Sequence, residues 1–189
     1  PTGGGGGLRG AGRVREENTG EGKGGRLTAR TSVSATGGQP VVPDLPGAEL
    51  GIVSDGFFSL EQRPKRVAVV GSGYVACELS GALHALGSEV EIFIRKGHLL
   101  MSFDAMLGKS LMREMSGQGI AIHPYVVPRS VQERSGIKTL IGVDGREFPG
   151  FDCLLWAVGR TANVAHLDLA NAGVAADDSG FVVTDGFQN

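Results

Sequence analysis

The segment Gly71-Ser72-Gly73 carries the clearest chemical signal in the sequence. It follows the continuous apolar run Val67 to Val70 and precedes the small residue Ala76. At this spacing the first glycine permits a tight turn, and the second lets a phosphate approach the backbone. The small third residue lets a helix pack closely on a strand. Since the N–H groups at a helix N-terminus favour phosphate oxygens, the segment predicts a dinucleotide-binding turn. A strand-to-helix turn without a ligand is the alternative.

Two cations follow the next predicted strand. Arg95 and Lys96 come directly after the apolar stretch 89–94. A site for NAD(H) places a carboxylate here, which accepts hydrogen bonds from the ribose hydroxyls, whereas cations at this position suit a 2′-phosphate. The pair therefore favours NADP(H), although a solvated basic pair at a strand end remains the alternative.

These residues can form one binding site only in an α/β fold, which brings the ends of its strands together. Hydrophobic periodicity predicts a βαβ unit and then a second helix, which Asp104 caps at its N-terminus. Short strands with turn residues between them follow, which is typical of a β-meander. We therefore predict a three-layer, Rossmann-like nucleotide-binding domain. The expected strands are 66–70, 89–94, 120–122, 126–133, 138–142 and 153–158, and the helices are 73–86 and 104–116.

Composition narrows the function classes. The chain has 189 residues and a net charge of −2, so it offers no electrostatic attraction for nucleic acid or an anionic membrane. No apolar run approaches the roughly 18 residues of a membrane span, and the N-terminus shows no signal-peptide core. The cysteines, Cys77 and Cys153, form neither a redox pair nor a metal-binding pattern. We expect a cytoplasmic protein with no metal, no nucleic-acid partner and no membrane partner.

The first third of the chain is different. Residues 1–26 are glycine-rich with few apolar side chains, so we expect a disordered head. Residues 27–62 are proline-rich and predict an irregular crossing segment.

Five motifs in order allow a family comparison. Together they resemble the glutathione-disulfide reductases of the pyridine nucleotide-disulfide oxidoreductase family, over about Ser34 to Asn189, with the head outside the match. The motifs are Ala35-Thr36-Gly37-Gly38, Ser54-Asp55-Gly56-Phe57-Phe58, Val67-Ala68-Val69-Val70-Gly71-Ser72-Gly73-Tyr74-Val75-Ala76, Ser102-Phe103-Asp104 and Trp156-Ala157-Val158-Gly159-Arg160.

The resemblance implies a homodimeric FAD enzyme. Such an enzyme passes a hydride from NADPH to the flavin, then electrons to an active-site disulfide, and finally reduces glutathione disulfide. In these terms residues 27–62 are an FAD-domain fragment and crossover, 63–163 are the NADPH-binding domain, and 164–189 begin the return to the FAD domain. The fold class is then α/β, a Rossmann-like domain with fragments of the FAD domain.

The resemblance also implies roles for single residues. Ser72 and Val75 match residues that line the nucleotide, and Tyr74 matches the tyrosine that covers the nicotinamide pocket. Glu78 matches a glutamate near the nicotinamide. The further matches are Arg95, with Lys96 beside it, at the 2′-phosphate, Gly159 and Arg160 at the cofactor, and Thr36 and Gly37 at an FAD-contacting turn.

Departures from the family pattern keep several hypotheses open. Met101 stands where the family has the second arginine of its phosphate clamp, and residues 30–34 are too polar for a buried strand. The sequence contains neither the Cys-x-x-x-x-Cys pair nor the FAD glycine motif, so we expect no catalytic residue of the disulfide chemistry here. The leading hypothesis is part of a glutathione reductase. The alternatives are an NADP(H)-binding fragment without catalysis, or a reductase of another disulfide.

Overall fold

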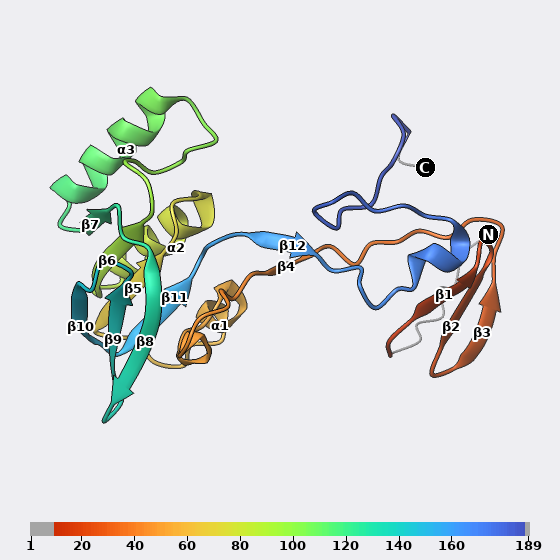
Figure 1. The fold of residues 1–189 in the computed structure, drawn as a ribbon, viewed down its shortest axis with the longest axis horizontal. Helices are drawn as coiled ribbons and strands as arrows, with labels where there is room; N and C mark the ends of the chain where they lie inside the picture. Colours follow the sequence, from red (N-terminus) through yellow and green to blue (C-terminus); the bar gives the residue numbers. More distant parts are fainter. Residues whose placement is uncertain (1–9, 188–189) are drawn as a thin grey trace. The chain divides into compact units, whose positions relative to one another are not determined.

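The computed structural model describes residues 10–187 and divides the chain into two compact units. The larger unit, residues 40–159, contains the predicted nucleotide turn, whereas the smaller unit combines residues 10–39 with 160–187 of the described chain. Figure 1 follows the chain through both units. Nowhere in residues 10–187 is a helix both long enough and apolar enough to cross a membrane.

A parallel sheet forms the middle layer of the larger unit. Its strands are β5 (Arg66–Val70), β6 (Glu89–Ile94), β7 (Ala121–Pro124) and β11 (Cys153–Trp156), in the order β11-β5-β6-β7. β5 lies between the strands β11 and β6, and both faces of the sheet are covered by other elements. Its residues 67–69 are therefore fully buried, as its continuous apolar sequence predicted.

Helices cover one face of this sheet. They are α2 (Tyr74–Ala85) and α3 (Ala105–Gly117), and the short α1 (Ser54–Phe58) adds Phe57 to the same core. The Asp104 carboxylate accepts a hydrogen bond from the Met106 N–H at 2.7 Å, which confirms the predicted N-cap. Leu79, Leu83 and Met115 face the sheet from the two longer helices.

An antiparallel meander covers the other face. Its strands β8 (Pro128–Arg134), β9 (Ile137–Gly142) and β10 (Glu147–Phe151) pair in the order β10-β9-β8. Val131, Leu140 and Phe151 pack with side chains from the sheet. The three layers confirm the predicted α/β, Rossmann-like fold class (Figure 1). The sequence pattern missed β10, whose Pro149 and Gly150 lie at an irregular register.

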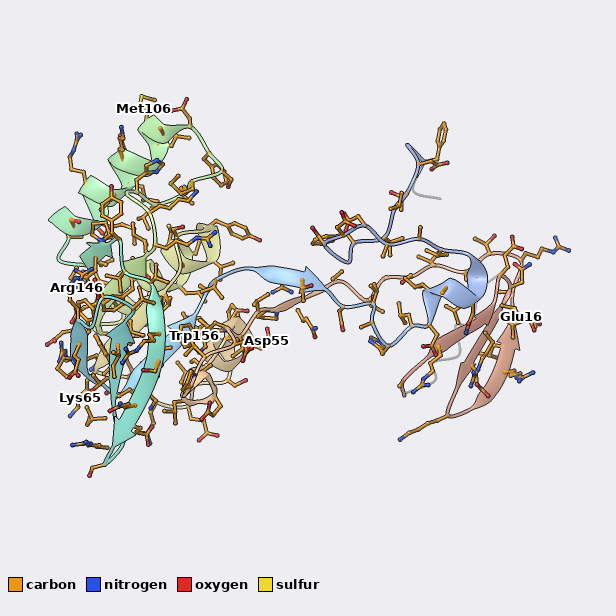
Figure 2. The ribbon with its side chains drawn as sticks, in the orientation of Figure 1. Glu16, Asp55, Lys65, Met106, Arg146 and Trp156 are labelled. Carbon is orange, nitrogen blue, oxygen red and sulfur yellow. The ribbon has the colours of Figure 1, made fainter. Side chains whose placement is uncertain are left out.

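The segment before β5 belongs to this unit. The turn η1 (Ala48–Leu50) lies against the sheet, and the buried Trp156 indole N–H donates a hydrogen bond to the Ala48 carbonyl at 2.8 Å. Ile52 extends the sheet beyond β11, since its N–H donates to Leu154 and its carbonyl accepts from Trp156, both at 2.8 Å. The Trp156 side chain is labelled in Figure 2. Residues 40–62 thus lie within the compact unit that ends at residue 159. The bounds of the NADPH-binding domain, 63–163, stay a prediction.

The smaller unit is built mainly from short strands. Its three-stranded antiparallel sheet contains β1 (Arg13–Glu16), β2 (Thr19–Gly22) and β3 (Gly25–Thr28). The unit also holds β12 (Arg160–Ala162), which pairs with β4 (Gly38–Pro40), and the turn η2 (Leu169–Ala172).

The expected disorder of residues 1–26 is wrong for residues 10–26, while residues 1–9 lie outside the described part. The ladder of the small sheet satisfies the backbone groups of this polar segment. Residues far along the chain hold it as well: the Val14 N–H donates to Leu167 at 2.7 Å, and the Asn171 amide donates to Val14 at 2.9 Å. Composition alone contains no information about such distant partners.

Candidate nucleotide-binding site

The glycine turn joins β5 to α2 at the carboxyl edge of the parallel sheet. Gly71 has a φ of 140°, and a Cβ at this position would lie 2.2 Å from the Ala157 carbonyl oxygen. Its N–H donates to the Phe93 carbonyl at 3.0 Å. The backbone that follows β11 thus excludes any side chain at residue 71, and the positive φ fits the tight turn predicted for the first glycine.

Gly73 has a different environment. It is the N-cap residue of α2 and offers no side chain to the first turn of the helix. A Cβ at this position would meet no described atom within 4 Å. This open space lies directly before the helix N-terminus, where backbone N–H groups favour phosphate oxygens. The position therefore fits the close approach of a pyrophosphate.

A cleft of about 260 Å³ lies over this edge of the sheet. It brings together five of the predicted site residues: Gly71, Ser72, Gly73, Arg95 and Gly159. The remaining lining residues are Val70, Phe93, Val126, Val127, Pro128, Ala157 and Val158. No motif marks Phe93, Val126, Val127 or Pro128, and the resemblance gave no role to Val70, Ala157 or Val158, which lie inside two of its motifs. Their signal was positional, since ligands of open α/β sheets bind beyond the carboxyl ends of the strands.

The cleft is basic at the end of β6. Arg95 and Lys96 are exposed, and neither forms an ion pair or a side-chain hydrogen bond within the described residues. No carboxylate occupies either position. The following loop is fixed to the glycine turn, because the Leu100 N–H donates to the Ser72 carbonyl at 2.7 Å. Arg95, which lines the cleft, is thus a free cation near the predicted pyrophosphate turn, and the exposed Lys96 follows it in the chain.

The predicted residues on α2 divide into two groups. Ala76 is fully buried against the sheet and Val75 packs partly on the same core, so the small residue performs the predicted packing role. Tyr74 and Glu78 are exposed one helical turn apart, and neither lines the cleft. Their positions near a nicotinamide stay predictions.

Thr36, Gly37 and Arg160 lie in the smaller unit. Asn163 holds the turn there, because its N–H donates to Gly37 at 2.9 Å and its side-chain amide donates to Thr36 at 3.4 Å. The Arg160 guanidinium donates to the Gly38 carbonyl. Thr36 also lines a cavity of about 510 Å³ in this unit. The FAD contact predicted for this turn stays a prediction.

The two cysteines are separate and neutral. Burial raises the pKa of the Cys77 thiol to about 11, and it raises the pKa of Cys153 to about 11 as well. Both thiols are free, which fits the predicted packing role. Within residues 10–187 no group of three or more histidine, cysteine and acidic side chains could hold a metal ion.

Comparison with known proteins decides the family. The family model described as pyridine nucleotide-disulphide oxidoreductase matches residues 7–189. The chain belongs to this family. Because the match begins at residue 7, it includes most of the glycine-rich head, which we had expected to lie outside the resemblance.

A curated relative refines the comparison. The chain is 41% identical over 165 residues to glutathione reductase of Schizosaccharomyces pombe. The match covers 86% of the chain but only 35% of the relative, so the chain spans about a third of that protein's length.

Solved structures agree on the fold. The HOCl-induced flavoprotein disulfide reductase RclA of Escherichia coli superposes with a TM-score of 0.87 over 94% of this chain and 41% of RclA, at 23% identity. Its Cu(II) complex gives a TM-score of 0.85 over 93% of the chain.

Proposed function

We propose that residues 40–159 bind NADP(H) within a flavoprotein that reduces glutathione disulfide. The observation that carries this proposal is the pair of free cations, Arg95 and Lys96, at the end of β6 beside the glycine turn. A carboxylate at this position would favour NAD(H), and a 2′-phosphate would be repelled by it. Identity of 41% to a glutathione reductase supports the same cofactor.

Different residues of the cleft bind different parts of the nucleotide. The pyrophosphate lies against residues 71–73 and the first turn of α2, where backbone N–H groups are available. Arg95 and Lys96 pair with the 2′-phosphate through charged hydrogen bonds. Met101, which is 41% exposed, cannot pair with a phosphate. The loss of one such partner costs about 1.5–3 kcal/mol of binding free energy, a tenfold or larger loss in affinity.

At the other end of the cofactor, Tyr74 covers the nicotinamide and Glu78 lies near it, as the family resemblance implies. Gly159 and Arg160 lie against the cofactor, and Thr36 and Gly37 contact FAD. Bound FAD would supply the acceptor of the NADPH hydride. In this proposal Tyr74 and Glu78 are the residues of this chain that orient the nicotinamide.

The substrate and assembly follow from the curated relative and the family pattern. We propose glutathione disulfide as the substrate of the whole protein and a homodimer as its assembly. The cytoplasm is the proposed location, because two free and separate cysteines fit a reducing compartment.

Nucleotide titration tests the cofactor assignment. We expect the chain to bind 2′-phospho-AMP at least about tenfold more tightly than AMP, since only the former carries the 2′-phosphate. Arg95→Ala should remove most of this preference and leave AMP binding unchanged. Arg113→Ala is the matched control, because Arg113 is an exposed arginine on α3 that does not line the cleft. Equal binding of the two nucleotides by the unsubstituted chain would overturn the proposal.

Assay of the full-length protein tests the substrate. The flavin-loaded protein should oxidise NADPH when glutathione disulfide is added. A protein that carries flavin but leaves glutathione disulfide unreduced would exclude this substrate and favour another disulfide. Failure to bind flavin at all would favour a nucleotide-binding module without catalysis.

A further inference from the structure

Tyr125 lies beside the predicted phosphate-binding loop. It directly follows β7 at the carboxyl edge of the sheet, one strand away from Arg95. A Cβ added at Gly97 would lie 2.7 Å from the Tyr125 hydroxyl oxygen and 3.5 Å from the carbon that bears it. The phenol therefore reaches across the loop that carries Arg95 and Lys96, and it does so at the one residue of this loop that lacks a side chain.

The position of Tyr125 is fixed by its neighbours. Its φ is 60°, a left-handed conformation that is uncommon for a bulky residue. The Arg146 guanidinium donates to the Tyr125 carbonyl at 3.2 Å, and the buried Val126 donates its N–H to Ile94 at 3.0 Å. These contacts hold the backbone in a strained conformation, and such conformations persist where the surrounding structure determines them.

Packing against other residues does not explain why a tyrosine occupies position 125. Its side chain is 70% exposed, and its hydroxyl has no hydrogen-bond partner within residues 10–187. Tyr125 is also absent from the lining of the cleft. What the structure places over the loop that carries Arg95 and Lys96 is an O–H donor without a partner among the described residues.

We propose that the Tyr125 hydroxyl donates a hydrogen bond to the 2′-phosphate of the bound nucleotide. It provides a neutral third contact beside Arg95 and Lys96, in a loop where Met101 provides none. This inference rests on the proposed NADP(H) function and assigns a specificity role to a residue that carries no sequence motif. A hydrogen bond from a neutral donor to a doubly charged phosphate is among the strong class, so its effect is measurable.

The test is nucleotide titration of the whole chain and its Tyr125→Phe variant. This substitution removes the hydroxyl and keeps the ring, so the backbone and its contacts persist. Affinity for 2′-phospho-AMP should fall about tenfold, whereas affinity for AMP should not change. AMP binding also serves as the control for a correctly folded cleft.

A second variant moves the phenol without changing it. The new Cβ in Gly97→Ala would displace the hydroxyl, and the residue 97 backbone does not have a positive φ, so alanine is tolerated there. This variant should also weaken 2′-phospho-AMP binding. In the Tyr125→Phe background it should add nothing, because the group that it displaces is already gone.

The outcomes separate this inference from the proposed function. If the unsubstituted chain fails to prefer 2′-phospho-AMP over AMP, both the NADP(H) assignment and the role of Tyr125 are overturned. If the chain shows the preference and Tyr125→Phe retains it in full, only the role of Tyr125 is overturned. A Tyr125→Ala variant that weakens both nucleotides equally, alongside an unaffected Tyr125→Phe, would replace the proposal with ring stacking on the adenine.

Discussion

The two units of the chain are ordered by different interactions. Of the buried hydrophobic residues within 10–187, all but Leu167 lie in residues 40–159. The larger unit packs these side chains in two layers around a parallel sheet, whereas the smaller unit relies on short strand ladders and loop hydrogen bonds. Apolar patterning therefore describes the first unit well and the second poorly, because burial produces the pattern.

The difference extends to the sites. The cleft proposed to bind the nucleotide is formed entirely within the larger unit, at the ends of strands whose positions the core fixes. The turn proposed to contact FAD is fixed by Asn163 and lies in the smaller unit, where buried apolar surface is scarce. We expect binding at the cleft to be less affected by substitutions elsewhere in the chain than binding at the turn proposed to contact FAD. Four experiments test this contrast, from the largest expected effect to the smallest.

Trp156→Ala should have the largest effect on stability. The side chain is 1% exposed, packs in the core beneath the meander and donates its indole N–H to Ala48. Removal of a buried tryptophan costs about 3–5 kcal/mol in the free energy of unfolding. The control is Val33→Ala in the smaller unit, which is 86% exposed and should change stability by less than about 0.5 kcal/mol. Denaturant titration measures both, and similar effects would contradict the contrast between the units.

The two glycines of the turn should separate stability from binding. Gly71→Ala forces a side chain against the Ala157 carbonyl at a positive φ, and such strain costs about 1–3 kcal/mol or more. Gly73→Ala meets open space, so it should change stability by less than about 1 kcal/mol. Its methyl group nevertheless occupies the predicted approach of the pyrophosphate, and nucleotide affinity should fall. Thermal melts and AMP titration distinguish the two, and unchanged AMP affinity in Gly73→Ala would count against the turn as the phosphate site.

The cysteines should make the larger unit sensitive to alkaline pH. Burial raises the pKa of Cys77 and of Cys153 to about 11 from an ordinary 9.0. Between these values the unfolded chain releases thiol protons that the folded chain keeps, so stability is full below about pH 9 and decreases as pH rises toward 11. Melting temperatures measured across this range should fall less steeply when both residues are alanine. An identical slope in the two proteins would show that the thiols contribute nothing.

Arg15→Ala should have the smallest effect. Arg15 pairs with Glu21 across the small antiparallel sheet, and both side chains are partly exposed. Exposed ion pairs contribute about 0–1 kcal/mol because water and salt screen them. Stability and nucleotide affinity of the larger unit should both be unchanged. A clear loss of nucleotide affinity in this variant would contradict the independence of the cleft.

Prediction from sequence succeeded where local chemistry determines structure. The glycine turn, the apolar strands 66–70 and 89–94, and the Asp104 cap each follow from residues close together in the chain. It failed for residues 10–26, which are ordered by their own ladder and by distant partners such as Leu167, and it gave no sign that the Ala48 carbonyl accepts from Trp156. Polar composition or proline content says nothing about a hydrogen bond made more than a hundred residues away.

The sequence by itself determined the glycine turn, the basic end of β6 and the α/β class, because these depend on residue spacing and on periodic burial. Only the tertiary structure decided that residue 71 must be glycine against the Ala157 carbonyl, and that the unit starts at residue 40. It alone brought the Tyr125 phenol over Gly97, because β6 and β7 must first pair before the segments that follow them can meet.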